Sequence, residues 1–129
     1  MSESIGPVER AIRSSLRAGQ ELHLASSGKP FRLGRFDRSG VEVLLGARET
    51  PVRLAWDALE GIPGFIRENA DRTGWLVVGG AHTSSAEPGR LDAYLKQFTP
   101  TNTARWIASL LAAAGVVDVL TRPVRVRLR

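Results

Sequence analysis

The stretch LDAYLKQFTPTNTARWIASLLAAAGVVDVLTRPVRVRLR, residues 91–129, carries the pattern that decides the fold. The spacing of its apolar side chains predicts two helices joined by a turn, and its last part alternates as a two-stranded ribbon does. Gly115 is typical of the residue just beyond a helix end. The helices are predicted over 91–98 and 104–114, the turn over 99–103, and the strands over 116–120 and 124–128.

The residues in front of this stretch add a helix and a strand. The helix is predicted over 57–69, and we expect it to be kinked or split because two glycines and a proline interrupt it. Residues 75–78 have the apolar character of a short strand, and the small and polar residues 79–89 predict an exposed loop.

From residue 57 to residue 129 the predicted order is therefore helix, strand, helix, helix, strand, strand. This arrangement resembles that of winged helix-turn-helix DNA-binding domains. The resemblance implies that the helix over 103–114 lies in the major groove of duplex DNA. It also implies that the ribbon over 116–129 forms an arginine-rich wing beside that helix. The N-terminal residues lie outside the resemblance.

A first helix is predicted to begin at Pro7, because the missing N–H group of a proline would be unpaired there in any case. Val8, Ile12 and Leu16 recur at four-residue spacing and form an apolar stripe. Gly19 is typical of the left-handed position that ends a helix.

Four β-prone runs with glycine-bearing turns follow, and their alternation predicts an antiparallel meander with one face packed inward against the first helix. The predicted fold class is α+β. Residues 1–56 are expected to form the helix and small sheet, and residues 57–129 the winged-helix-like unit, packed together as one compact protein. The four runs are 21–25, 29–36, 41–45 and 52–56.

Positive charge is concentrated at the C-terminal end. The 129 residues carry a net charge of +5, and the basic side chains are 16 arginines and 2 lysines. Residues 90–129 hold 7 basic and 2 acidic side chains, so this segment alone carries +5. Arginine favours two-pronged contacts with phosphate and guanine, so double-stranded DNA is the expected partner. A GC-rich genome explains the preference for arginine over lysine equally well.

The second helix of the stretch holds candidate base-reading residues opposite its apolar stripe. Asn102 and Arg105 suit the edges of adenine and guanine, and Ser109 is predicted to share their face. Thr103 lies where a helix N-terminus can meet a phosphate, although capping of the helix is the simpler interpretation. Trp106 borders the stripe and is interpreted as a core residue. The predicted stripe is Ile107, Leu110, Leu111 and Ala114.

In the last strand, arginines alternate with valine and leucine, which places the arginines on one face of the ribbon. Such a wing contacts the phosphate backbone or a minor groove, with Lys96 and Arg90 assisting at the backbone. The alternative is an edge strand whose charges prevent edge-to-edge aggregation. The predicted wing residues are Arg122 at the tip and Arg125, Arg127 and Arg129 along the strand.

These residues predict a non-catalytic DNA-binding protein of the bacterial cytoplasm, either a small transcription regulator or the DNA-recognition part of a larger system. The alternative is a protein-interaction adaptor or a homodimer that uses the alanine-rich face at 112–114. No cofactor, metal site or membrane segment is expected, because cysteine is absent and no run of apolar residues is long enough. A catalytic site in loop 79–89, built on His82 and Glu87, is the remaining alternative.

Overall fold

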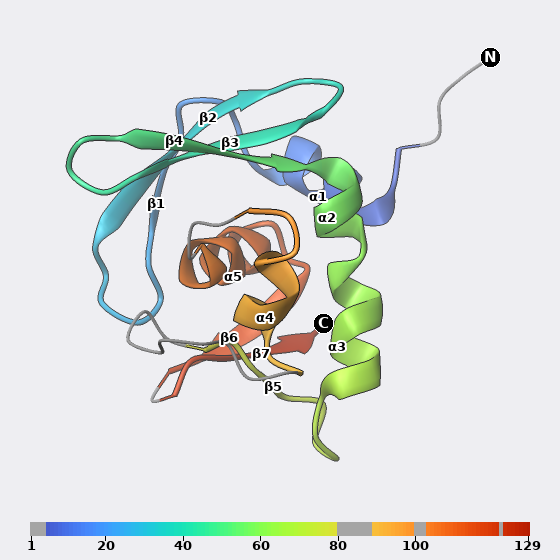
Figure 1. Cartoon of the computed structure of the whole chain (residues 1–129). Helices are drawn as coiled ribbons and strands as arrows, with labels where there is room; N and C mark the ends of the chain where they lie inside the picture. The colour runs from blue at the N-terminus through green and yellow to red at the C-terminus, as the bar shows by residue number, and fades with distance from the viewer. Residues whose placement is uncertain (1–4, 80–88, 100–102, 122) are drawn as a thin grey trace.

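The computed structural model describes residues 5–79, 89–99, 103–121 and 123–129 (Figure 1). The predicted α+β class is confirmed, since helices accompany two antiparallel sheets. In chain order the elements are α1 (Pro7–Ser15), β1 (Glu21–His23), β2 (Pro30–Phe36), β3 (Gly40–Leu45), β4 (Thr50–Ala55), α2 (Trp56–Glu60), α3 (Ile62–Asn69), β5 (Leu76–Val77), α4 (Leu91–Leu95), α5 (Ala104–Ala113), β6 (Val117–Leu120) and β7 (Arg125–Leu128).

The first sheet is the predicted meander, with antiparallel strands in the order β1-β2-β3-β4. The β2–β3 pairing shifts register between Leu33 and Phe36, whereas β3 and β4 pair along their whole lengths. Asp37 closes the β2–β3 hairpin, because its carboxylate accepts hydrogen bonds from the backbone N–H groups of Ser39 and Gly40.

The second sheet has the spatial order β5-β7-β6, and both pairings are antiparallel. The last strand of the chain, β7, is therefore its central strand. In the chain, α4 and α5 lie between β5 and β6. The inner face of this sheet carries Leu76, Val117 and Val126, each at most 2% exposed, and packs on the core.

A carboxylate from α2 holds the N-terminal end of α1. Glu60 accepts hydrogen bonds from the backbone N–H groups of Val8 and Glu9, at 3.0 and 2.8 Å. These N–H groups have no partner inside the helix, so the carboxylate replaces a capping side chain. Gly6 makes room for it, because a Cβ atom at this position would lie 2.2 Å from the Glu60 Cδ atom.

Helix α5 lies at the centre of the fold, between the meander and the second sheet (Figure 1). It contacts β1, β6, α1 and α4. One hydrophobic core includes residues of both halves of the chain; Leu33 in β2 and Leu110 in α5 are both fully buried. The inward face of the meander therefore packs in a core that includes α5, whereas the sequence predicted only the first helix as its support.

Two helix boundaries show how tertiary contacts modify local signals. The predicted split of the helix over 57–69 is confirmed, since α2 and α3 meet at Gly61. The predicted end of α1 at Gly19 is wrong, because the helix ends at Ser15. Gly19 instead donates its N–H to the Leu33 carbonyl of β2, so pairing with the sheet begins before a longer helix can form.

Candidate nucleic-acid interface

The hairpin of β6 and β7 presents its arginines on the outer face of the second sheet, as the alternation predicted. Val126 is 1% exposed and belongs to the core, whereas its neighbour Arg127 is exposed. Because β7 is hydrogen-bonded to β5 on one side and to β6 on the other, the interpretation as a protective edge strand is wrong. The arginines lie in the middle of a sheet face.

One carboxylate on β6 orders two of these arginines. Asp118 lies opposite Arg127 in the strand register, and its Oδ2 atom is 3.7 Å from an Arg127 guanidinium nitrogen. Its Oδ1 atom accepts a 2.8 Å hydrogen bond from Nε of Arg129. Two cations thus share one anion, so this cluster keeps a net charge of +1.

An indole ring supports Arg127, together with Arg125, from the β5 side. The guanidinium carbon of Arg127 lies 4.5 Å from the centroid of the Trp75 ring, and that of Arg125 lies 5.9 Å from it. Guanidinium groups at this range are attracted to the ring face. The side chains are therefore held in place before any partner binds.

The loop before β5 is stabilised by Asp71. Its carboxylate accepts hydrogen bonds from the Thr73 hydroxyl at 2.5 Å and from the backbone N–H of Trp75 at 3.2 Å. The hydrogen bond from the Thr73 hydroxyl is the largest cause of a lowered pKa for Asp71, and the nearby charge of Arg125 also lowers the pKa. Asp71 is therefore an anion at neutral pH and helps to fix Trp75.

Neither Trp75 nor Asp118 was among the predicted site residues. Asp118 had only an incomplete signal, because counting outward from the predicted turn at 121–123 places residue 118 opposite Val126. The observed pairing of Leu120 with Arg125 is shifted by one residue and places Asp118 opposite Arg127. Trp75 had none, since the pairing of β5 with β7 joins segments far apart in the sequence.

A pocket of about 330 Å³ lies where the helix ends and the wing meet. It brings together Arg90, which precedes α4, and Arg105, in the first turn of α5, with residues that precede β7. Its two arginines are the only charged residues among those described around it. The lining residues are Ser26, Val77, Gly79, Arg90, Arg105, Pro123 and Val124.

Arg90 is held in this pocket by a buried acid. Asp92 is 2% exposed, and its Oδ2 atom is 3.3 Å from an Arg90 guanidinium nitrogen. Gly79 allows the close approach, because its φ is +96° and a Cβ atom there would lie 2.2 Å from Oδ2 of Asp92. The pair fixes the guanidinium at the start of α4.

The predicted polar face of α5 is not a free surface, which corrects the expected role of Ser109. This side chain is 6% exposed, and its Oγ atom accepts a 3.0 Å hydrogen bond from the Ala25 N–H, beyond the end of β1. Thr103 is 1% exposed, and its side chain makes no capping hydrogen bond. It therefore does not cap α5, and its hydroxyl is not exposed for contact with a phosphate. Trp106 packs against the core, as predicted, and Asn102 lies outside the described residues.

All four members of the predicted apolar stripe of α5 are buried, so that prediction is confirmed.

The last two predicted DNA-binding residues are Lys96 and Arg122. Lys96 is exposed at the C-terminal end of α4, whereas Arg90 precedes the first residue of that helix, so the pocket does not include Lys96. Arg122 lies outside the described residues.

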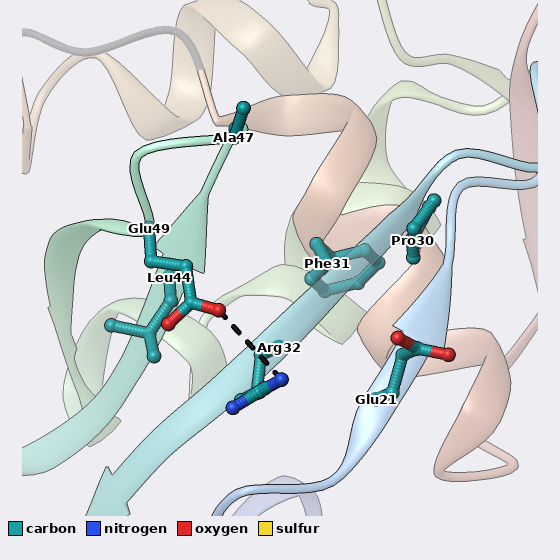
Figure 2. Close-up of a pocket in the computed structure, with 8 residues that line it drawn as sticks. Glu21, Pro30, Phe31, Arg32, Leu44, Ala47 and Glu49 are labelled. Carbon is teal, nitrogen blue, oxygen red and sulfur yellow. Dashed lines mark ion pairs between the residues drawn. The ribbon is translucent and has the colours of Figure 1, made fainter.

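A second pocket of about 330 Å³ lies on the meander and has the opposite electrostatic character (Figure 2). Its charged residues are Glu21, Glu49 and Arg32, and Arg32 points toward Glu49 with a nitrogen–oxygen distance of 3.7 Å. Two carboxylates and one guanidinium leave a net charge of −1. An anionic ligand is therefore expected at the α5 end of the molecule and not here.

Within the described ranges, no three histidine, aspartate or glutamate side chains gather as metal ligands. In the same part of the chain, every helix is too short or too polar to cross a membrane. His82 and Glu87, on which a catalytic loop would depend, are outside the described residues. Comparisons with known protein families, with curated proteins and with solved structures find no match for this chain.

Proposed function

We propose that this protein binds duplex nucleic acid, in the first place DNA, without catalysing a reaction. The observation that carries the proposal is the outer face of the second sheet, where β7 presents Arg125 and Arg127 beside Arg129. The order of elements from α2 to β7 and the β6–β7 hairpin support the resemblance to winged helix-turn-helix domains. A small regulator or the DNA-recognition part of a larger system would both use such a surface.

The structure changes the expected mode of contact. A recognition helix reads bases along its exposed face, but α5 packs in the core and contacts β1. We therefore infer that the first turn of α5 and the arginines of β7 contact the phosphate backbone. Backbone contacts set affinity and position and carry little sequence information, so the expected binding tolerates many sequences.

The test is a fluorescence-anisotropy salt titration with random-sequence duplex DNA, double-stranded RNA and single-stranded DNA. For the duplexes we expect a slope of log K against log salt of about −3 to −5, from a handful of phosphate contacts. The double variant Arg125→Ala/Arg127→Ala should reduce the slope by about 2 for every duplex sequence tested.

The matched control is Arg35→Ala/Arg48→Ala, which removes two exposed arginines from the meander side. It changes the net charge equally and should leave the slope close to that of the wild type. Equal effects of the two double variants would contradict the assigned surface. Absence of binding to all three nucleic acids at low salt would contradict the function itself.

A protein-docking module is the second candidate, and one row of the second sheet favours it. Leu120 and Val77 both pair with Arg125, and they are 41% and 38% exposed. Two apolar side chains thus flank an arginine on an open sheet face, as at many protein interfaces. Sedimentation of wild type and Leu120→Glu, with the nucleic-acid assay in parallel, separates a homodimer from a nucleic-acid-binding monomer.

A further inference from the structure

The pocket between Arg90 and Arg105 has the composition of an anion site. The described residues around it include two guanidinium groups and no carboxylate. Its walls are partly apolar, with Val77, Pro123 and Val124. Charges that face such walls interact more strongly than charges in open water.

Arg105 supplies the observation that points to a ligand. Its Nε atom is shielded from solvent and has no hydrogen-bond acceptor among the described residues. A guanidinium donates through all of its N–H groups, and a buried donor without an acceptor is unfavourable. An oxyanion in the pocket would supply the missing acceptor.

The helix that carries Arg105 adds further donors. Its first-turn backbone N–H groups have no partners within the helix, and the N-cap residue Thr103 makes no side-chain hydrogen bond to them. The Thr103 hydroxyl is itself buried without a partner. The positive end of the ten-residue helix α5 therefore reinforces the charge of Arg105.

Two kinds of oxyanion can be compared in the pocket. A phosphodiester carries one negative charge, whereas a phosphomonoester carries about −1.5 to −2 at neutral pH, so diethyl phosphate and inorganic phosphate serve as the two probes.

We propose that this pocket binds one phosphate group, and that Arg105 anchors a phosphate and does not read a base. This inference rests on the proposed function where the phosphate belongs to a duplex. A small phosphorylated molecule is the other source of the same group, and a pocket of about 330 Å³ is large enough for a small ligand.

The experiment follows the Nε–Hε signal of Arg105 by two-dimensional NMR, assigned with the variant Arg105→Gln. The probes are diethyl phosphate, inorganic phosphate and a short duplex DNA. We expect a saturable shift with diethyl phosphate and with the duplex, and about tenfold weaker diethyl phosphate binding in Arg105→Gln, followed through shifts of backbone amides around the pocket. Arg32→Gln, in the pocket on the meander, is the matched control and should change neither response.

Anisotropy adds a readout that separates the two roles of Arg105. Loss of a phosphate contact should reduce the salt slope by about 0.9 and weaken all duplex sequences alike. Loss of a base contact would instead relax a sequence preference, and that result would overturn the proposal. Thermal unfolding of Arg105→Gln and Arg32→Gln verifies that both variants fold.

The outcomes distinguish the pocket from the wider function. A shift with inorganic phosphate but not with the duplex would support the pocket and overturn its duplex source. No shift with any probe would overturn the pocket. If the Arg125→Ala/Arg127→Ala variant still lost duplex binding in that case, the proposed function would stand without the pocket.

Discussion

Removal of the Asp118 carboxylate should strengthen duplex binding. The variant Asp118→Asn keeps the size of the side chain and one hydrogen-bond acceptor, but it removes the anion that Arg127 and Arg129 share. Both guanidinium groups then become available to phosphates. A gain of binding is informative, because damage to the fold does not produce it.

The size of the effect follows from counterion release. One additional neutralised phosphate makes the salt slope steeper by about 0.9, which corresponds to roughly eightfold tighter binding at about 0.1 M salt. The loss of stability should be small. The side chains of Asp118, Arg127 and Arg129 are 38%, 46% and 60% exposed, and exposed ion pairs contribute only about 0–1 kcal/mol each.

The assay is the anisotropy titration on one random-sequence duplex, with urea unfolding in parallel. Glu49→Gln is the matched control, because it makes the same change of charge and releases Arg32 on the meander. We expect Glu49→Gln to change the slope by much less than Asp118→Asn. Equal or weaker binding by Asp118→Asn, with an intact fold, would refute a role for these arginines at the phosphate backbone.

Three further predictions concern the contacts that hold the site together. Ser109→Ala should lower the free energy of unfolding by about 1 kcal/mol in urea, because the part-buried hydrogen bond from the Ala25 N–H is lost, whereas Ser14→Ala in the exposed part of α1 should have little effect. Glu60→Gln should cost about 1 kcal/mol, since α1 loses the charge and one of the two acceptors at its N-terminal end. Asp37 has a lowered pKa, chiefly through its hydrogen bond from Arg53, so its contribution to stability is present above about pH 4 and is lost as the pH falls toward the folded-state pKa. Stability measured from pH 7 downward should therefore fall less steeply in Asp37→Asn than in the wild type.

Each of these predictions has an outcome that contradicts it. Equal unfolding free energies for the two serine variants would show that the link between α5 and the meander is not stabilising. An unchanged midpoint of urea unfolding for Glu60→Gln would remove the argument that the Glu60 carboxylate caps α1. Parallel acid profiles for wild type and Asp37→Asn would mean that other carboxylates dominate the acid response.

Local signals determined the elements and one face of the site. The stripe of α5, the split at Gly61 and the meander depend on side-chain spacing and on turn residues that lie within a few positions of each other. The alternation of Val126 with Arg125 and Arg127 likewise follows from the two-residue repeat of a strand. These features could be predicted because the physical cause and its effect are neighbours in the chain.

Contacts between distant segments decided the rest. Ser109 has the polarity of an exposed residue, and only the packing of β1 against α5 buries it. The sequence showed β7 as a charged strand but not as a central one, because its partner β5 lies far away in the chain. Arg90 and Arg105 share a pocket for the same reason. Which segments meet depends on how all the apolar faces of the chain can be buried together, and no local pattern contains that information.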